Sequence, residues 1–234
     1  MCVAAIAWAA HPRWRMVAIG NRDEFHERPT APLAEWDNGI IAGRDLEAGG
    51  TWLGVHPEGR FALVTNLRSP GYPRPELASR GALVTDALLG KPPEPVPARN
   101  PFNLWFADGT RLRFASNLPD WNEHDLRPGI HGLSNGARGD RWFKTARLED
   151  ALAAWLEQDS PVEELFGPLC DETPQSPDPE DAFSPVFIVN PTYGTRCSTI
   201  IVIDNEGRGR IIERSYDASA APSGEVALDF AWPS

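Results

Sequence analysis

A cysteine directly after Met1, Cys2, is one of only three cysteines in this chain of 234 residues. Removal of Met1 would make Cys2 the first residue and place its thiol next to a free α-amine. Such an amine has a pKa of about 7.7–8.0, which suits a general base near neutral pH. The amine can take the thiol proton while the sulfur attacks an acyl carbon, as in threonine nucleophiles paired with a terminal amine. Cys2 is therefore the candidate nucleophile, and a low thiol pKa is the expected sign of its reactivity.

A thiol nucleophile also needs hydrogen-bond donors for the oxyanion and groups that orient the thiol and the amine. Four polar residues near the ends of expected strands are candidates for these tasks. Asp23 follows the second strand of the opening hairpin, so it should return beside Cys2. Asn66 ends a later strand, Asn135 lies in the segment GLSNG ahead of a helix, and Arg196 immediately precedes a late strand. We expect these side chains to share one cleft with the sulfur of Cys2.

Each candidate also has an ordinary structural use. A cysteine is often a small apolar core residue, and Asp23 can pair with neighbouring arginines instead of serving the thiol. Asn66 can end a strand, and Asn135 can cap the helix that follows it. The five histidines lie in turn-like settings. No single histidine is favoured as a haem ligand, because haem ligation needs a particular pocket around the ligand.

The elements that must position these residues are mainly hairpins, because short apolar runs flank turn sequences such as HPR, HPEG and NEG. Helical periodicity occurs twice, at residues 76–90 and at residues 140–158, where Asp140 is the expected N-cap. Hairpins with two helices between them predict an α+β protein, with helices packed on antiparallel sheet. The expected strands are Cys2–Ala10 with Trp14–Gly20, Thr51–Val55 with Phe61–Asn66, Leu104–Phe106 with Arg111–Ala115, Val186–Asn190, and Thr199–Asp204 with Arg210–Ser215.

The composition is that of a globular protein with a substantial core, with 41% hydrophobic and 24% charged residues. We expect one domain, residues 1–234, with an acidic, proline-rich excursion at about residues 157–184. The net charge of −11 argues against a nucleic-acid partner, because phosphate binding needs clustered Lys and Arg. The segments GxGxxG, GxxxxGK[ST] and HExxH are absent from the sequence, which excludes the commonest nucleotide-binding and zinc-protease functions.

The spacing of Cys2, Cys170 and Cys197 matches neither a disulfide framework nor a metal site. We therefore expect no metal and a reducing, cytoplasmic location. The apolar run Val3–Ala10 is far too short to span a bilayer, so no integral membrane segment is expected.

Several motifs together carry a family resemblance that extends to about residue 205. The segments are NRDEF, GTWLG, FALVTNLR, GLSNG and YGTRCSTIIVID. With these segments the chain resembles the NRDE family, which is named for Asn21-Arg22-Asp23-Glu24 and includes the transport and Golgi organisation protein 2 group. That family is in turn similar to the cysteine N-terminal nucleophile hydrolases, such as bile salt hydrolases and penicillin V acylases. The resemblance implies an αββα sandwich, in which two antiparallel sheets are flanked by helices.

The same resemblance implies a role for each candidate. Cys2 matches the nucleophile, and Asp23 matches the aspartate that holds the amine and the thiol. Asn66 and Asn135 match two asparagines near the oxyanion and the amine. Arg196 is a weaker match to a late arginine.

One position departs from the pattern of the hydrolases. They usually carry an arginine or another polar side chain three residues before the aspartate, and Gly20 stands there in this chain. Either Arg22 fills this position from a different angle, or the catalytic machinery is incomplete. We expect the substrate to contact Arg22, Glu24, Trp52 and Arg68.

Two functions of different classes are compatible with the resemblance. The first is an amidohydrolase or acyltransferase that acts on a small acylated substrate through a thioester and needs no cofactor. The second is a non-catalytic carrier on the same fold, which binds haem or a fatty acyl-CoA in the corresponding pocket. Both predict a small-molecule ligand or substrate.

Overall fold

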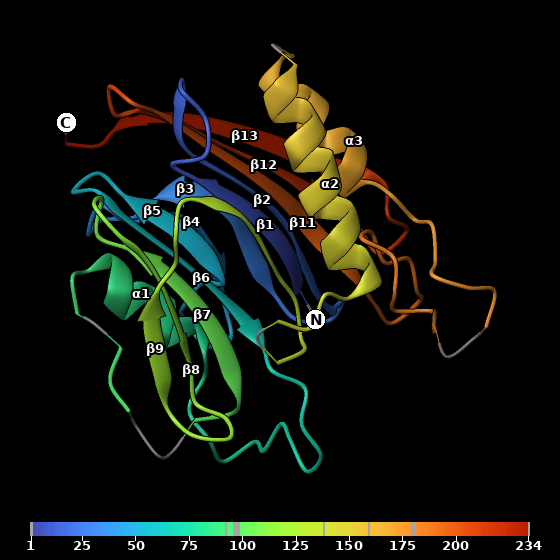
Figure 1. Ribbon diagram of the computed structural model, residues 1–234. Helices are drawn as coiled ribbons and strands as arrows, with labels where there is room; N and C mark the ends of the chain where they lie inside the picture. Colours follow the sequence, from blue (N-terminus) through green and yellow to red (C-terminus); the bar gives the residue numbers. More distant parts are fainter. Residues whose placement is uncertain are drawn as a thin grey trace.

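The computed structural model describes residues 2–91, 93–95, 99–137, 139–158, 160–178 and 181–233. In this part of the chain two antiparallel sheets stack face to face, one of six strands and one of seven (Figure 1). The six-stranded sheet contains, in spatial order, β10 (Gly129–Leu133), β1 (Cys2–Trp8), β2 (Trp14–Phe25), β11 (Tyr193–Asp204), β12 (Arg208–Tyr216) and β13 (Pro222–Ala231). The seven-stranded sheet contains β3 (Thr30–Glu35), β4 (Ile41–Asp45), β5 (Leu53–His56), β6 (Arg60–Asn66), β7 (Phe102–Ala107), β8 (Leu112–Ser116) and β9 (Asn122–Asp125).

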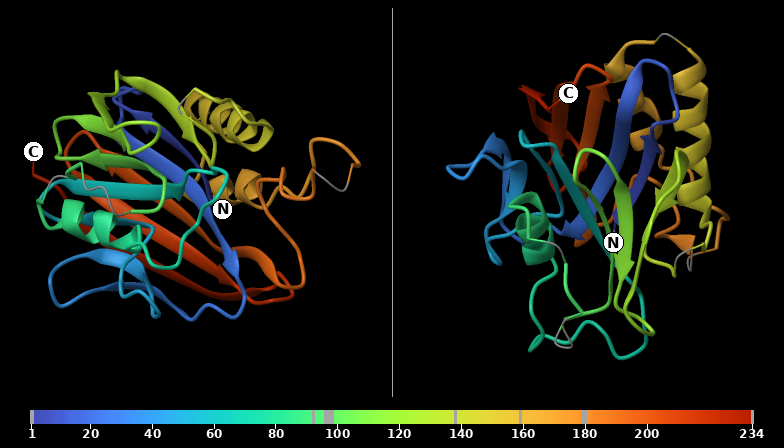
Figure 2. Two further views of the ribbon diagram at one scale, coloured as in Figure 1. Left: turned by 90° about the horizontal axis from the view of Figure 1, so that it is seen from below. Right: turned by 60° about the vertical axis from the view of Figure 1, so that its left-hand side comes forward.

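Helices cover the outer faces of both sheets, as the two further views show (Figure 2). Helix α2 (Phe143–Glu157), the 3-10 helix η1 (Val162–Leu165) and the short helix α3 (Phe166–Leu169) pack on the six-stranded sheet. Helix α1 (Gly81–Leu88) packs on the seven-stranded sheet. The predicted αββα sandwich is therefore confirmed.

Strand β1 is apolar on both faces because both of its faces are covered. Its even-numbered residues, from Cys2 to Trp8, belong to the core between the sheets. Val3, Ala5 and Ala7 belong to the outer core beneath α2. Side chains alternate between the faces of a strand, so a strand that is buried on both sides appears as a continuous apolar run.

Strand β2 is longer than the sequence predicts. The expected strand ended at Gly20, but β2 continues to Phe25 and includes the whole NRDE segment. The polar residues Asn21–Glu24 predict the end of a strand at this point. In the fold they stay in the strand because β11 pairs with the segment as far as Phe25, and β1 pairs with it as far as Arg22.

Helix α2 begins at Phe143 and buries Leu148, Leu152 and Trp155 against the six-stranded sheet. The prediction of Asp140 as its N-cap is wrong, because Trp142 occupies that position and makes no side-chain capping bond. None of the described helices combines the length and the apolar character that crossing a bilayer requires.

Two other predictions of local structure need correction. Residues 186–190 form no strand, although Val186 and Ile188 are buried. The segment is apolar because other parts of the chain cover it. Hydrogen bonds hold it in place: the Ile188 amide donates to the Thr195 hydroxyl, and the Val186 carbonyl accepts from the Asn21 side chain. The acidic segment after Trp155 is partly packed, since η1 and α3 bury apolar side chains in the outer core.

Four predicted hairpin pairs are confirmed, although their ends differ by a few residues. Five further strands were not predicted from the sequence: β3, β4, β9, β10 and β13. In β9 and β13 most side chains are at least partly exposed, so the apolar alternation that marks a strand is weak.

Candidate functional site

A cavity of about 1270 Å³ lies between the sheets at the end where β1 begins. The six-stranded sheet forms its floor. Cys2 is paired with Arg22, and Arg22 is paired in turn with Cys197, so these residues form a row across β1, β2 and β11. Ser215 on β12 continues the row. All four residues line the cavity.

Cys2 is the nucleophile that the sequence predicts, and it is 8% exposed. Burial raises the pKa of the Cys2 thiol, and the nearby charge of Asp23 raises it further. The backbone amide of Asp23 and the charge of Arg22 oppose this shift. The direction of this shift is opposite to the low pKa expected of a reactive thiol. The carbonyl of Cys2 accepts a 2.9 Å hydrogen bond from the Ser134 hydroxyl, which fixes the start of β1.

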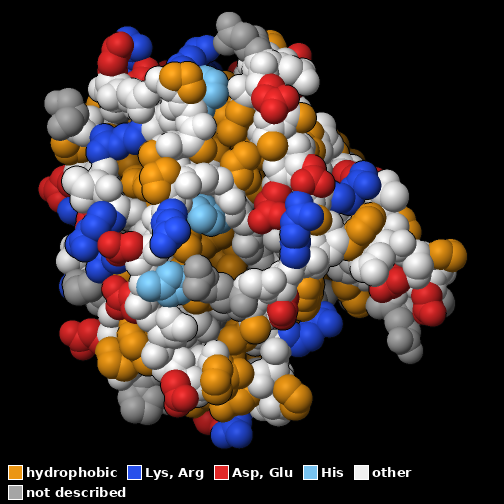
Figure 3. Space-filling view, viewed as in Figure 1, with side chains coloured by type: hydrophobic (Ala, Val, Ile, Leu, Met, Phe, Trp, Pro, Cys, Tyr) orange, Lys and Arg blue, Asp and Glu red, His pale blue; other side chains and the backbone are white. Residues whose placement is uncertain are grey.

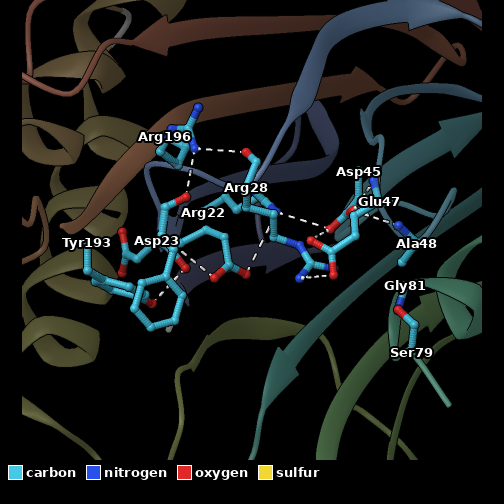
Figure 4. Close-up of polar contacts among 12 residues, drawn as sticks. Arg22, Asp23, Arg28, Asp45, Glu47, Ala48, Ser79, Gly81, Tyr193 and Arg196 are labelled. Atoms are coloured by element: carbon cyan, nitrogen blue, oxygen red, sulfur yellow. Dashed lines mark hydrogen bonds and ion pairs between the residues drawn. The ribbon is translucent and has the colours of Figure 1, made fainter. Parts of the chain in front are cut away.

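Asp23 is buried beside Cys2 at the end of the β1–β2 pairing. The Thr195 hydroxyl donates to Asp23 Oδ1 at 2.8 Å. Asp23 Oδ2 lies 3.8 Å from Nζ of Lys144, a lysine of α2. Burial raises the pKa of Asp23, and the charge of Lys144 opposes this shift. The Tyr193 hydroxyl also donates to the backbone carbonyl of Asp23 at 2.7 Å (Figure 4).

Lys144 is a site residue that the sequence did not predict. Its side chain is only 1% exposed. One indirect signal is present in the sequence, because Lys91 and Lys144 are the only lysines among 22 Lys and Arg residues. Nothing local in the helix indicates that this lysine meets Asp23.

Arg22 projects into the cavity and pairs with acidic side chains. Its Nη2 lies 3.3 Å from Asp45 Oδ2 and 3.8 Å from Glu24 Oε2. Arg28 Nε also contacts Asp45 Oδ2, at 2.6 Å (Figure 4). These contacts leave Arg22 Nη1 buried without a hydrogen-bond partner in the described part of the chain. That nitrogen is a donor available to a bound carbonyl or anion.

The two predicted asparagines are adjacent but lie in different environments. Asn66 ends β6, as expected, and lines the cavity. Asn135 is 1% exposed and is not among the lining residues. Its Nδ2 donates to the backbone carbonyl of Asn66 at 2.8 Å, and its own carbonyl accepts from the Arg68 amide. Asn135 therefore ties the segment after β10 to the end of β6, and it does not cap α2.

Arg196 lines the cavity but is engaged with the backbone. It lies within β11, at the bulge between Thr195 and Cys197, rather than before the strand. Its Nη1 donates to the carbonyls of Phe25 and Arg28 at 2.9 and 3.1 Å (Figure 4). It also donates to the His26 carbonyl at 3.1 Å. This arginine therefore holds the turn that follows β2.

The expected substrate contacts are divided between the cavity and the surface. Glu24 and Trp52 line the cavity together with Arg22. Arg68 is exposed, is not a lining residue, and its guanidinium lies 5.6 Å from the ring centre of Trp142.

Trp52 also explains the glycine that departs from the hydrolase pattern. A Cβ placed on Gly20 would lie 3.2 Å from the tip of the Trp52 ring and 2.8 Å from the Val3 carbonyl. A larger residue at this position would collide with backbone and ring. The space that an arginine would need is therefore occupied by Trp52.

Charges of both signs line the cavity in equal number. The basic residues are Arg22, Arg28, Arg44, Arg74, Arg80 and Arg196, and the acidic ones are Asp23, Glu24, Asp45, Glu47, Glu213 and Glu225. Acidic and basic side chains are also interspersed over the face of the molecule that Figure 3 shows. The described residues contain no group of three His, Cys, Asp or Glu side chains that could hold a metal ion. Among the described lining residues, the side chains of a type that can ligate haem iron are the thiols of Cys2 and Cys197 and the phenol groups of Tyr193 and Tyr216.

Comparison with solved structures defines the class of the fold. A mutant of the conjugated bile acid hydrolase from Clostridium perfringens matches with a TM-score of 0.56 and 10% identity, over 98% of this chain and 92% of that chain. The N-acylethanolamine-hydrolyzing acid amidase ortholog of Caenorhabditis elegans matches with a TM-score of 0.50 and 12% identity, over 86% of this chain and 92% of that chain. The fold is therefore that of the N-terminal nucleophile hydrolases.

Within that class the sequence identifies a family. The model of the Transport and Golgi organisation 2 family matches residues 1–218, and the chain belongs to this family. The Transport and Golgi organization protein 2 homolog of Homo sapiens is 31% identical over 92% of this chain and 93% of its own length. The Drosophila melanogaster protein is 26% identical over 96% of this chain and 95% of its own length.

Proposed function

We propose that this protein is an N-terminal-cysteine amidohydrolase or acyltransferase that acts on a small acylated substrate through a thioester. The observation that carries the proposal is the place of Cys2. Its side chain lines a large cavity, with Arg22 beside it and the Asp23 amide directed at the sulfur. The names of the two structural neighbours, an acid amidase and a conjugated bile acid hydrolase, agree with this reaction class.

The reaction requires a mature chain that begins at Cys2, and Met1 lies outside the described residues. The free α-amine takes the thiol proton while the sulfur bonds to the acyl carbon of the substrate. The carbonyl oxygen becomes an oxyanion, for which the Asn66 amide and Arg22 Nη1 are the donors that face the cavity. The C–N bond then breaks, the α-amine returns the proton to the leaving amine, and the acyl group remains on sulfur. Water releases the acid, or a second nucleophile accepts the acyl group.

The raised pKa of the thiol fits this proton route better than a resting thiolate. Burial keeps the thiol protonated near neutral pH. The proton must therefore leave as the sulfur attacks, which the adjacent amine allows. Reaction with simple alkylating agents should accordingly be slow compared with acylation by a bound substrate.

The size of the cavity favours a bulky substrate. Ligand pockets commonly measure about 300–1,000 Å³, and this cavity measures about 1270 Å³. Because its charged lining is balanced in sign, size and shape should select the substrate more strongly than its net charge does.

Intact-mass spectrometry with an activated ester, 4-nitrophenyl octanoate, tests the proposal. The protein should lack Met1 and gain one octanoyl group on Cys2. The adduct should disappear in Cys2→Ala and persist in Cys170→Ala, the matched control that removes an exposed thiol. Retained Met1 together with an unmodified Cys2 would overturn the enzyme proposal.

A non-catalytic carrier is the second candidate, and one observation favours it. The side-chain amide of Asn135 donates to a backbone carbonyl instead of facing the cavity. A carrier would bind haem or an acyl-CoA in the same cavity. Saturable binding that Cys2→Ala leaves unchanged, in a protein that forms no thioester, would establish the carrier instead of the enzyme.

A further inference from the structure

Lys144 occupies a position that is unfavourable for a lysine. It is the second residue of α2, and its side chain is 1% exposed. The N-terminal turn of a helix carries partial positive charge, so it favours anions and disfavours cations. Lys144 Nζ also has no hydrogen-bond partner among the described residues. It forms an ion pair with Asp23, whose Oδ2 lies 3.8 Å from Nζ.

The groups that face Lys144 come from three neighbouring elements. They are Asp23 from β2, Cys2 from β1, and Arg68 from the segment that follows β6. Burial lowers the pKa of Lys144, and Arg68 lowers it further, whereas Asp23 and Cys2 raise it. Burial raises the pKa of Asp23, and Lys144 is the strongest influence in the opposite direction. The charge of each member of the pair therefore depends on the other.

Asp23 connects this lysine to the nucleophile. Its backbone amide interacts with the sulfur of Cys2. Its carboxylate accepts from Thr195 on one oxygen and faces Lys144 with the other. A change at Lys144 is thus transmitted to Cys2 through a single residue.

Packing alone does not account for this lysine. Replacing a buried ion pair with apolar side chains of similar volume is often neutral or stabilising. Further along its buried face α2 packs the apolar side chains Leu148 and Leu152 against the same sheet. A lysine at position 144 is useful if Asp23 must be an anion, because a nearby cation favours the ionised carboxylate.

We propose that Lys144 is a positioning residue: its buried ammonium group fixes the Asp23 carboxylate, as an anion, beside the start of β1, where it orients the α-amine and thiol of Cys2. This inference rests on the proposed function. To that function it adds Lys144, a residue of a helix that lies more than a hundred positions after Cys2 and Asp23 in the chain.

The pH dependence of Cys2 acylation by 4-nitrophenyl octanoate tests the role of Lys144. Without Lys144 the Asp23 carboxyl should take up its proton at higher pH, because the opposing positive charge is gone. In Lys144→Met the acid limb of the acylation profile should move upward by at least about one pH unit, a tenfold change in rate on that limb. Lys144→Arg should restore part of the shift, and Lys91→Met, which alters the exposed lysine, should cause none.

A direct titration separates this inference from the proposed function. The carboxyl carbon signal of Asp23, followed by NMR in protein labelled at aspartate, should show the same upward shift in Lys144→Met. An unchanged Asp23 titration would overturn the inference, even in an active enzyme. If the wild-type protein forms no thioester, the proposed function fails, and the titration still decides whether Lys144 controls Asp23.

A double variant keeps the test decisive if Lys144→Met folds poorly. Lys144→Met combined with Asp23→Asn removes both charges and should unfold at a urea concentration no lower than that of Lys144→Met alone. The acylation rate of the double variant should nevertheless stay at least tenfold below that of the wild type. Recovery of a wild-type rate and pH profile in the double variant would show that the pair is merely structural.

Discussion

Two buried carboxyl groups line the cavity, and their surroundings differ. Asp23 lies beside Cys2 and Glu213 lies on β12, and they are 1% and 5% exposed. Burial raises the pKa of both. Asp23 faces a full positive charge on Lys144 at 3.8 Å. Glu213 is held by neutral donors and has Arg22 only as a longer-range charge.

The donors to Glu213 come from both sheets. The Leu33 amide of β3 donates to Oε1 at 2.8 Å, and the Thr199 hydroxyl of β11 donates to Oε2 at 3.4 Å. A Cβ on Gly43 of β4 would lie 3.1–3.2 Å from the carboxyl oxygens, so only a glycine leaves them this space. Glu213 therefore cross-links the sheets.

The difference teaches how a buried acid can be recognised as structural or functional. Neutral donors that meet both carboxyl oxygens hold the group in place and tolerate its protonated form. A lone cation instead favours the anion, at the expense of desolvating both charges. A buried carboxylate that faces a single cation is useful where the function requires the anion. Asp23 and Lys144 form this arrangement next to Cys2, the candidate nucleophile.

The largest expected effect is on acylation. Asp23→Ala should slow octanoylation of Cys2 by at least about 100-fold, the range associated with loss of a group that serves proton transfer. Glu213→Gln should slow it by less than about tenfold, because Glu213 contacts neither Cys2 nor Asp23. Stopped-flow release of 4-nitrophenolate measures both rates. Equal losses of acylation rate in the two variants would show that Asp23 serves the reaction no more than Glu213 does.

The next largest effect is on stability, and here we expect Glu213 to matter more than Asp23. Glu213→Ala should lower the free energy of unfolding by about 1–3 kcal/mol, because the Leu33 amide is left buried and unpaired. Glu213→Gln keeps an acceptor there and should stay within about 1 kcal/mol of the wild type. Urea unfolding followed by tryptophan fluorescence gives these values. A stable Glu213→Ala variant would show that the cross-link is dispensable.

A smaller effect is expected where a hydroxyl supports the backbone at Asp23. Tyr193→Phe keeps the ring contacts with Phe25 and Phe183 and removes the 2.7 Å bond to the Asp23 carbonyl. The loss should be about 0.5–1.5 kcal/mol in urea unfolding. A proportionate fall in acylation would indicate that the backbone, and not only the carboxylate, positions Cys2.

The smallest effect is a pH dependence that belongs to Glu213. Its folded pKa is raised above the ordinary value of 4.5. Its contribution to stability is therefore fully present below the unfolded pKa and is lost as the pH rises through the folded pKa. The wild type should lose stability relative to Glu213→Gln as the pH increases above 4.5. Urea midpoints of both proteins at several pH values test the sign, and a difference that grows in the opposite direction would contradict it.

The opening hairpin was predictable because its pairing is local. The turn after Trp8 fixes the register in which Cys2 faces Arg22, so the nucleophile and the NRDE segment had to come together. The same logic identified the hairpin that contains Asn66 and the hairpin of Thr199–Asp204 with Arg210–Ser215. Edge strands escaped prediction where exposure removes the apolar alternation, as in β13.

Contacts between distant segments could not be predicted in this way. Lys144, Glu213 and Asn135 have their partners in elements that are not their neighbours in the chain. Asn135 shows the consequence, because its residue type suggested an oxyanion donor or a helix cap. Its amide instead bonds the Asn66 carbonyl.

By itself the sequence determined which groups the start of the chain brings together: the thiol of Cys2, the guanidinium of Arg22 and the carboxylate of Asp23. It determined this because strand alternation and a short turn are local properties. Only the tertiary structure decided the state of these groups. Packing of α2 on β1 excludes water and places Lys144 against Asp23, and desolvation and nearby charge set the pKa of the thiol and the carboxyl.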